Sequence, residues 1–470
     1  MASDVPNRIG GNHPMTRGIF AAVAITAFAI STASAQIALI AKGTLTGTSA
    51  GSNADLSGLT GLLENGAAAN LLGGLGSGIA YLDGDTFLAL PDRGPNAVSF
   101  DAAIDDTVSY VNRFHTVRMH LQPGNGGTLP FTIAPEVIST TLLRSITPLA
   151  YSPGEGLGVG SGVPEINKQP FHYFTGRSDN FNPDRTSDDG GDGRFDTEGI
   201  RASNDGKEVF ISDEYGPYVY QFDRSTGTRT RIFRLPAKFF VENPNSQGAV
   251  EIANSISGRV SNKGMEGLAI TPDGKTLVGI MQNSLIQDAA EGGDATRLLR
   301  IVTIDIKSGK ATHEYGYLLT TGSGVSEILA LNNHEMLVDE RDGKGLGDGS
   351  KAKVKQIFKV DLADATDIGD MNGTAAASNA APKTLFLDVV QALTSAGFTT
   401  DQIPAKIEGI AFGPDVASAN GTLHTLWVAN DNDFLQDLNG PGTNPNQYFV
   451  FGFSDSDLGG SKFIPQEHSR

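Results

Sequence analysis

The chain has 470 residues, of which 39% are hydrophobic, and a formal net charge of −18. This surplus of acidic residues argues against a nucleic acid or an anionic membrane as a partner, and it is compatible with cation binding as well as with plain solubility. Because there is no cysteine, disulfides, thiol nucleophiles and cysteine-based metal sites are excluded.

The first 35 residues have the pattern of a signal peptide. Two arginines flank the start of an apolar run at residues 18–30, which is too short to cross a bilayer comfortably, and Ala33-Ser34-Ala35 matches an A-x-A cleavage signature. We predict cleavage before Gln36, with an uncleaved anchor as the alternative. The mature chain is then expected to be a secreted or periplasmic monomer that is not embedded in a membrane.

A short phrase with glutamate recurs four times, each time before a run that is typical of a β-strand. The copies are Thr197-Glu198-Gly199-Ile200, Met265-Glu266-Gly267-Leu268, Ser326-Glu327-Ile328-Leu329 and Ile407-Glu408-Gly409-Ile410. An earlier copy, Gly78-Ile79-Ala80-Tyr81, lacks the glutamate. Each run ends in a polar cluster, and these clusters are Asp92-Arg93, Asp213-Glu214, Gln282-Asn283, Asp339-Glu340-Arg341 and Asn430-Asp431-Asn432-Asp433.

The spacing of the phrases predicts an all-β fold, a β-propeller. The glutamates are 68, 61 and 81 residues apart, which is too long for leucine-rich or tetratricopeptide repeats but suits four-stranded blades of about 40–50 residues with added loops. Five units are visible in the single domain that we assign to residues 36–470. We predict six blades of antiparallel strands, the sixth closed by the strand after Gln36. The best helical candidate is Asp388–Ala396.

Residues 152–195 form a long polar insertion in this domain. A structureless loop of that length is often functional. Its end, Asp188 to Asp196, resembles a calcium loop, but glycine replaces the ligands that an EF-hand needs at two positions. A bound calcium and a solvated loop are both open here.

A propeller arranges the inner strands of its blades around a central channel, so residues beside these strands converge on one mouth. That geometry would gather Asp92, Glu198, Glu266, Glu327 and Glu408. A buried glutamate is costly unless it is paired, so its repetition suggests a ring of carboxylates. The structural alternative is that each glutamate accepts backbone N–H bonds from the neighbouring blade and locks the propeller.

The phrases, in this order, resemble the phytase-like family, exported bacterial proteins described by an esterase-like activity of phytase. The resemblance covers about residues 70–455 and rests on the glutamate phrases and the polar clusters, together with Arg297-Leu298-Leu299-Arg300. It implies a β-propeller with recurrent acidic residues and a phosphoesterase activity. Gln282-Asn283 departs from the pattern, because many relatives have Asn-Glu at this point.

Crowded carboxylates repel one another, and some acquire raised pKa values, unless a cation lies among them. Oxygen ligands favour Ca²⁺, with Mg²⁺ as the alternative. Our leading hypothesis is therefore a calcium-dependent phosphoric ester hydrolase. The catalytic candidates are Glu198, Glu266 and Glu408, the substrate-binding candidates are Arg93 and Arg341, and the metal-binding candidates are Asp92, Asp213, Glu214, Glu327, Asp431 and Asn432.

Two other functions remain open: a non-catalytic propeller that binds a ligand or partner at the acidic mouth, and a calcium-dependent lactonase-type esterase. The acidic ring favours an enzyme with a small-molecule substrate. Only two arginines lie in the repeated motifs, so a simple phosphomonoester or diester is easier to accommodate than phytate. The sequence has no H-x-x-x-H pair for zinc.

Overall fold

The computed structural model describes residues 37–47, 54–124, 126–151, 162–216, 218–418, 421–436 and 443–468. The predicted signal peptide and its cleavage site lie outside the described residues, as do residues 152–161 of the polar insertion. The architecture described here is that of the unit Ala35–Arg470.

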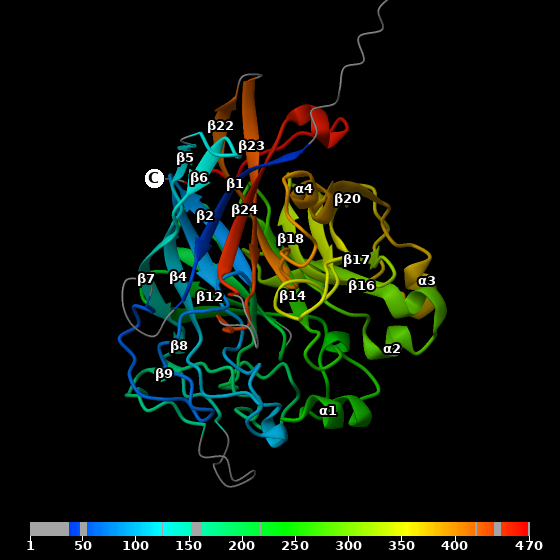
Figure 1. Cartoon of the computed structure of the whole chain (residues 1–470). Helices are drawn as coiled ribbons and strands as arrows, with labels where there is room; N and C mark the ends of the chain where they lie inside the picture. The colour runs from blue at the N-terminus through cyan, green and yellow to red at the C-terminus, as the bar shows by residue number, and fades with distance from the viewer. Residues whose placement is uncertain are drawn as a thin grey trace, which may run out of the picture. The chain divides into compact units, whose positions relative to one another are not determined.

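Five sheets follow one another around a central axis, four of them with four strands and the second with six, and the innermost strand of each sheet carries the repeated phrase (Figure 1). From the inside outward, the first three sheets consist of β2 (Gly78–Asp83), β3 (Thr86–Leu90), β4 (Arg113–Arg118) and β7 (Glu136–Leu142); β10 (Thr197–Ala202), β11 (Glu208–Asp213), β12 (Tyr218–Asp223) and β13 (Thr228–Arg234); and β14 (Met265–Ile270), β15 (Thr276–Met281), β16 (Leu298–Asp305) and β17 (Lys310–Leu318). The last two consist of β18 (Gly324–Ala330), β19 (Glu335–Arg341), β20 (Lys355–Asp361) and β21 (Lys383–Asp388); and β22 (Ile407–Ser418), β23 (Gly421–Asn430), β24 (Asn446–Phe453) and β1 (Ala38–Leu45).

The propeller closes with five blades, so the prediction of six is wrong. The inner strands contact one another in the order β2, β10, β14, β18 and β22, and β22 contacts β2. The strand after Gln36, β1, pairs antiparallel with β24 and completes the fifth blade, which therefore combines the first and the last described strands. A sixth blade would need further inner-strand contacts, and the ring is already complete among the described residues.

The interval between β7 and β10 adds no blade of its own within the part of the chain that the structure describes. It contributes β8 (Arg144–Ser145) and β9 (His172–Tyr173), which extend the outer edge of the second sheet. A separate hairpin, β5 (Leu121–Pro123) with β6 (Phe131–Ile133), lies between β4 and β7 along the chain. The extra residues of this interval are therefore loops that reach over one end of the propeller.

Each sheet is buried on both faces, because a hydrophobic cluster lies between every pair of neighbouring sheets. Strand β3 shows the pattern. Phe87 and Ala89 pack toward the fifth sheet, and Leu88 and Leu90 pack toward the second. Successive side chains of a strand point to opposite faces, so a strand buried on both faces has a continuous apolar sequence.

The helices are short, and α1 to α3 lie to one side of the strands in Figure 1. They are α1 (Gly248–Asn254), α2 (Ile286–Ala289), α3 (Gly373–Ala377) and α4 (Val389–Ser395), with 3₁₀ turns at Ala102–Ile104, Ala237–Phe239, Gly293–Arg297 and Asp455–Leu458. Helix α4 confirms the predicted helix, and the Asp388 side chain caps it by accepting from Gln391 N at 2.9 Å. None of the described helices is long and apolar enough to cross a membrane.

Glycines of the repeated phrase allow the inner strands to approach one another closely. A Cβ atom added at Gly267 would lie 2.6 Å from the backbone nitrogen of Ile328 in β18, and one added at Gly199 would lie 2.7 Å from Leu268 N in β14. No side chain fits at such distances. The narrow five-bladed ring therefore explains why glycine follows glutamate in the phrase.

Arg201 closes the channel inside this ring. Its guanidinium donates to the carbonyl oxygens of Ile79 in β2, at 2.7 Å, and Ile328 in β18, at 3.0 Å. Because these strands belong to different blades, the arginine spans the channel. The mouth where the inner strands begin is consequently a cup with a floor, and residues beside that mouth form the candidate site.

Candidate functional site

Three glutamates of the repeated phrase sit on β-bulges. The pairing of the inner strand with its neighbour shifts between Thr197 and Ile200, between Met265 and Gly267, and between Ile407 and Ile410. A bulge leaves a residue unpaired and redirects its side chain, and bulges are common beside active sites. Glu198, Glu266 and Glu408, the predicted catalytic residues, are the redirected residues, and burial, followed by repulsion from neighbouring carboxylates, raises the pKa values of Glu198 and Glu266.

The third phrase is offset by one residue. In β18 the shift falls between Val325 and Glu327, so Ser326 takes the position of the bulged glutamates and Glu327 takes that of the glycine. Glu327 accepts from Leu268 N of the neighbouring blade at 2.8 Å and from its successor's N–H at 3.0 Å. Its other oxygen pairs with Arg201. Glu327, a predicted metal ligand, therefore lies in the channel floor with both oxygens engaged.

A second layer of the site comes from the ends of the strands. In each of three sheets, the residue before the inner strand bonds the residue after the second strand: Glu214 N donates to Asp196 O, Gln282 N to Gly264 O, and Asp431 N to Lys406 O. In the fourth sheet, Gly324 pairs with Arg341. The same backbone geometry therefore directs six side chains to one mouth: Asp196, Glu214, Gln282, Arg341, Lys406 and Asp431.

Four acidic residues form what we name the open cluster: Asp196, Glu198, Glu214 and Glu266. The first three each place an oxygen within 4.8 Å of the others. Glu266 lies close enough to Glu214 for the two carboxyls to interact electrostatically, and its Oε2 atom is buried without a hydrogen-bond partner. Burial, followed by repulsion from Glu214, raises the pKa of Glu266 well above its ordinary value.

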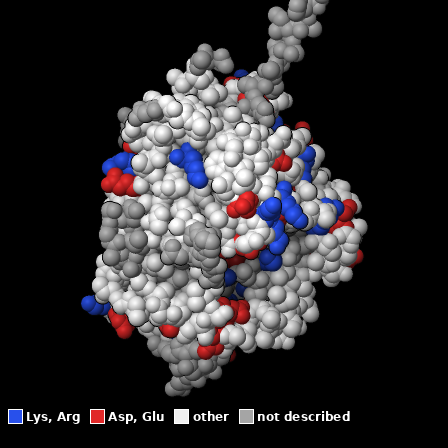
Figure 2. Space-filling view, in the orientation of Figure 1, with Lys and Arg blue, Asp and Glu red and all other residues white. Residues whose placement is uncertain are grey.

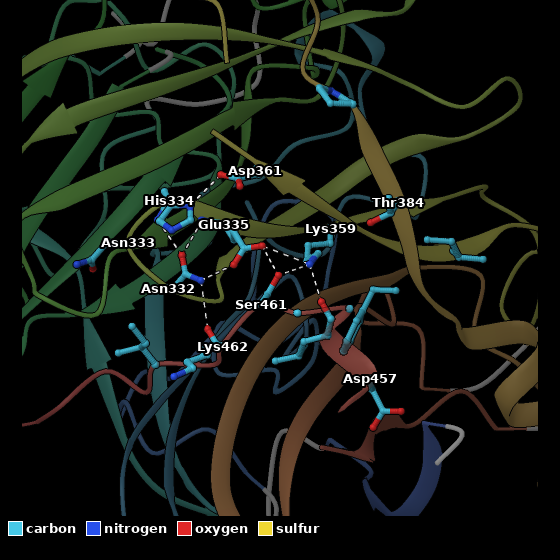
Figure 3. A pocket seen from close by; sticks show the side chains of 17 residues that line it. Asn332, Asn333, His334, Glu335, Lys359, Asp361, Thr384, Asp457, Ser461 and Lys462 are labelled. Carbon is cyan, nitrogen blue, oxygen red and sulfur yellow. Dashed lines mark hydrogen bonds and ion pairs between the residues drawn. The ribbon is translucent and has the colours of Figure 1, made fainter. Parts of the chain in front are cut away.

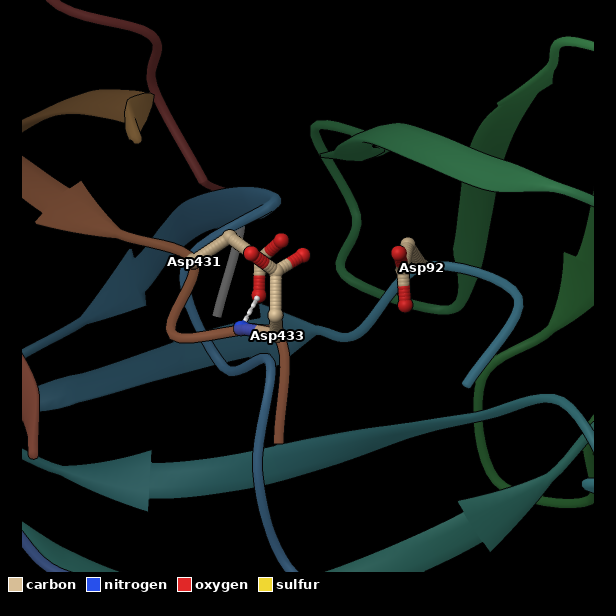
Figure 4. A group of neighbouring side chains, drawn as sticks. All are labelled: Asp92, Asp431 and Asp433. Carbon is tan, nitrogen blue, oxygen red and sulfur yellow. Dashed lines mark hydrogen bonds between the residues drawn. The ribbon is translucent and has the colours of Figure 1, made fainter. Parts of the chain in front are cut away.

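Three aspartates form what we name the lysine-bound cluster: Asp92, Asp431 and Asp433. Figure 4 shows Asp431 and Asp433 side by side, with Asp92 facing them from another segment. Lys406 Nζ lies 2.7 Å from Asp433 Oδ1, contacts Asp431, and approaches Glu408 to 3.6 Å. A cation of the protein's own therefore already occupies this cluster, whereas in the open cluster the described ion pairs include only that of Asp196 with Arg93.

Two predicted metal ligands have their oxygens engaged with the backbone. Asp213 accepts from the N–H groups of Asp196, Tyr215 and Gly216 at 2.6 to 3.1 Å. Asn432 accepts from Gly74 N and donates to Asn444 O, both at 2.8 Å. These residues hold the loops of the mouth and do not join either cluster.

Both predicted substrate-binding arginines lie at the mouth. Arg93 Nη1 is 2.5 Å from Asp196 Oδ2 and also contacts Asn262. Arg341 Nε donates to Ser326 Oγ at 2.8 Å, and its Nη2 contacts Glu408. Their side chains are 17% and 15% exposed, so each is fixed by a carboxylate and still reaches solvent at the rim of the cup.

Sequence reasoning did not assign Asp196, Lys406 or Asp433 to this site, although all three belong to it; Asp196 was considered only as the last residue of the possible calcium loop. Asp196 and Lys406 directly precede two of the glutamate phrases, and Asp433 ends the last polar cluster. The sequence signal for these three residues was therefore their position relative to the repeated phrases and polar clusters. A comparison of the residues one place before each phrase could have found the first two.

The site has more negative than positive groups. Eight carboxylates, Asp92, Asp196, Glu198, Glu214, Glu266, Glu408, Asp431 and Asp433, face three cations, Arg93, Arg341 and Lys406, so full ionisation would leave 3 − 8 = −5. On the face shown in Figure 2, by contrast, lysines and arginines lie beside acidic residues. The uncompensated charge is buried at the mouth, and only protons or metal ions can balance it there.

The open cluster fits a hard divalent cation. All of its donors are carboxylate oxygens, the type that Ca²⁺ and Mg²⁺ prefer. The buried Oε2 atom of Glu266 lacks a partner, which a metal ion would supply. The lysine-bound cluster fits less well, because Lys406 would have to leave.

A cavity of about 1070 Å³ lies away from this mouth, between the fourth and fifth blades (Figure 3). Its polar side chains are paired with one another. Glu335 bonds Asn332 at 2.6 Å and pairs with Lys359 at 3.3 Å, and His334 bonds Asp361 at 2.8 Å. These groups satisfy each other, so the cavity offers no convergent reactive set of the kind found at the acidic mouth.

Comparisons with known proteins give a family and several relatives. The model of the family described as "esterase-like activity of phytase" matches residues 70–434. An uncharacterized secreted protein of Arthroderma benhamiae is 26% identical over 420 residues, which cover 78% of this chain and 77% of that protein. Among solved structures, the allergen Mala s 1 of Malassezia sympodialis is 11% identical with a TM-score of 0.36, covering 84% of this chain and 81% of its own. A putative 6-phosphogluconolactonase of Bacteroides uniformis is 12% identical with a TM-score of 0.31, covering 82% and 92%.

Proposed function

We propose a phosphoric ester hydrolase function on the premise that the chain belongs to the phytase-like family, described as esterase-like activity of phytase. In this proposal the protein is exported, as the description of its fungal relative supports. The substrate is a small phosphomonoester or diester. The reaction takes place in the cup formed by the open cluster and its arginine rim.

The observation that carries the proposal is the unbalanced charge of the open cluster. Asp196, Glu198, Glu214 and Glu266 would hold Ca²⁺, with Mg²⁺ as the alternative. Such an ion supplies positive charge for the phosphoryl oxygens and for the developing charge of the reaction. Without it, the same carboxylates would repel the substrate.

The rim residues orient the phosphoryl group. Arg93 and Arg341 come from different blades, and each has one edge fixed by a carboxylate. A guanidinium presents further N–H donors in a planar fork that matches phosphate oxygens. The two arginines would therefore bind opposite sides of one phosphoryl group above the cup.

The glutamates differ in the proton chemistry that they can perform. Glu408 contacts two cations, Arg341 and Lys406, and would act as the general base that accepts a proton from the attacking water. Glu266 tends to keep a proton, because burial and Glu214 raise its pKa. Glu266 would therefore act as the general acid that donates a proton to the leaving group.

The experiment that tests the proposal is hydrolysis of p-nitrophenyl phosphate, bis-p-nitrophenyl phosphate and a simple lactone by the mature chain. Each substrate is assayed in EDTA and after Ca²⁺ is restored. We expect calcium-dependent phosphate release, reduced at least about 100-fold in Glu266→Gln and in Glu408→Gln. Glu136→Gln, which changes an exposed glutamate of β7, serves as the control and should keep full activity.

Other outcomes identify the alternatives. Lactone turnover without phosphate release would replace the phosphoesterase with a lactonase-type esterase. Absence of turnover on every substrate, combined with a calcium-dependent rise in melting temperature, would instead indicate a propeller that binds a ligand or a partner at the same mouth.

A further inference from the structure

A second polar cavity adjoins the acidic mouth. Its volume is about 200 Å³, and its lining includes Arg93, Arg194, Arg259, Tyr215 and Asn262. Arg93 belongs to both sites, because its Nη1 atom contacts Asp196 of the open cluster and Asn262 of the cavity. An anionic group in the cavity would therefore lie one arginine away from the proposed reaction site.

Arg194 is buried in this lining with little compensation for its charge. Its side chain is 1% exposed, and Nη1 donates to the carbonyl oxygen of Ser178 at 3.2 Å. Its Nη2 atom has no hydrogen-bond partner, and Nε lies 3.8 Å from the nearest carboxylate oxygen, of Asp192. A buried cation without a well-bonded counter-charge is expensive.

Aromatic rings fix the position of this guanidinium. It lies 4.3 Å from the ring centre of Phe181 and 5.1 Å from that of Tyr215. Cation–π contacts of this kind stabilise the charge without using its N–H donors. Arg194 is thus held in place while its Nη2 atom makes no hydrogen bond.

The acidic residues of the lining are already engaged. Glu251 pairs with Arg259 and accepts from Asn245 N at 3.0 Å, and Asp105 accepts from Gly248 N at 2.6 Å. Arg259 in turn donates twice to the carbonyl oxygen of Tyr215, at 2.8 and 2.9 Å. The positive charge left without a close partner in this cavity is that of Arg194.

We infer that this cavity binds a phosphate-type oxyanion, with Arg194 as its principal ligand and Arg93 and Arg259 beside it. Guanidinium groups bind phosphate oxygens in a bidentate manner. The hydroxyls of Thr107, Ser178 and Ser246 in the lining already donate to backbone carbonyl oxygens, so the hydroxyl that can add a donor is that of Ser261. The volume is below the 300–1,000 Å³ typical of sites for larger ligands, so it suits a single anionic group.

Two sources could supply this oxyanion: free inorganic phosphate, or a second phosphate group on the substrate. The second source rests on the proposed function and would make the cavity a specificity pocket. The substrate class would then be esters that carry two phosphate groups, one cleaved in the cup and one anchored by Arg194. Binding of inorganic phosphate does not depend on that function.

Isothermal titration of sodium phosphate into the mature chain tests the inference. The titration is made in EDTA and at constant ionic strength, so that neither a metal site nor general screening contributes. We expect saturable binding that weakens at least about tenfold in Arg194→Gln, the loss of a charge-assisted contact. Arg229→Gln is the matched control, because Arg229 stacks on Tyr220 and Phe174 of the same blade and does not line the cavity.

A second variant keeps the test decisive if Arg194→Gln does not fold. Ser261 is partly exposed at the edge of the cavity, and Ser261→Asp places a negative charge there. Phosphate should bind at least about tenfold more weakly to it. Absence of saturable binding to the unmodified chain at 10 mM phosphate, or equal binding by all variants, would overturn the inference.

Kinetics separate the two sources and the two proposals. If the anchored group belongs to the substrate, Arg194→Gln raises KM for a bisphosphate ester and leaves KM for p-nitrophenyl phosphate unchanged. Phosphate binding without any hydrolysis would retain the cavity site and reject the hydrolase. Calcium-dependent hydrolysis without phosphate binding in EDTA would retain the hydrolase and reject the cavity site.

Discussion

Nη2 of Arg201 lies 3.0 Å from Oε2 of Glu327, and this ion pair closes the central channel beneath the open cluster. Both side chains are buried, and the arginine also bonds carbonyl groups of several blades. Glu327 shares its short motif with Glu266, yet its Oε1 atom accepts from two backbone N–H groups and its Oε2 atom forms the ion pair with Arg201, whereas the described ion pairs include none of Glu266. Replacing one or the other of these two glutamates should therefore change the free energy of unfolding in opposite directions.

We predict that Glu327→Gln lowers the free energy of unfolding and that Glu266→Gln does not. Glu327→Gln leaves Arg201 buried without its counter-charge and should lower the free energy of unfolding by roughly 3–5 kcal/mol. Glu266→Gln relieves repulsion in the open cluster and should leave stability unchanged or raise it. Urea unfolding in EDTA measures both, and equal stability of the two variants would contradict this assignment.

Lys406 holds the place of a metal ion in the lysine-bound cluster, so its removal should expose a new cation site. In Lys406→Met, repulsion among Asp92, Asp431 and Asp433 is uncompensated, and we expect a loss of roughly 2 kcal/mol, moderated because the lysine side chain is 26% exposed. Calcium should then raise the melting temperature of the variant more than that of the unmodified chain. Lys207→Met, at a lysine that is 77% exposed, is the control, and an equal calcium effect in all three proteins would argue against this role.

Stability should fall with rising pH in the absence of metal. Burial raises the pKa of Asp92 to about 7 and those of Glu198 and Glu266 well above their ordinary values. The folded protein therefore binds more protons than the unfolded chain from about pH 4 upward, and the free energy of unfolding decreases as these protons leave. His115, whose pKa burial lowers to about 4, acts in the opposite direction, but its contribution is complete above about pH 6.5.

The measurable window is thus pH 6.5 to 8. In EDTA, we expect the free energy of unfolding to drop by more than about 1.4 kcal/mol across it, the equivalent of one pKa unit. Saturating Ca²⁺ should abolish the drop, because a bound cation favours the ionised carboxylates. Stability in EDTA that stays flat or rises across the window would contradict the raised pKa values.

The glycine of the repeated phrase should tolerate no side chain. In Gly267→Ala the new Cβ would meet Ile328 N at 2.6 Å, and separation of β14 from β18 should cost roughly 2–3 kcal/mol. At Gly343 an added Cβ meets no atom within 4 Å and the backbone is not left-handed, so Gly343→Ala is the matched control. Thermal unfolding of the two variants measures this loss of stability. If neither variant loses stability, the inner strands can move apart.

The sequence by itself determined the strands and the propeller class. Runs such as Thr86–Leu90 are apolar throughout because both faces of each blade are buried, and the spacing of the glutamate phrases marks one inner strand per blade. Residue type also pointed to the acidic mouth, since Glu198, Glu266 and Glu408 could only be tolerated together in such a place. Those inferences depend on the order of residue types along short segments, and this order can be read directly from the sequence.

Only the tertiary structure decided the number of blades and the partner of each carboxylate. Five blades close because glycines let the inner strands approach, and β1 completes the fifth blade through pairing with β24, more than 400 residues away along the chain. A one-residue shift of the bulge in β18 moves Glu327 into the channel floor, and Lys406 reaches Asp433 across the end of a sheet. Register and long-range pairing are set by contacts among distant segments, so residues with the same local motif acquire different roles only when the ring has closed.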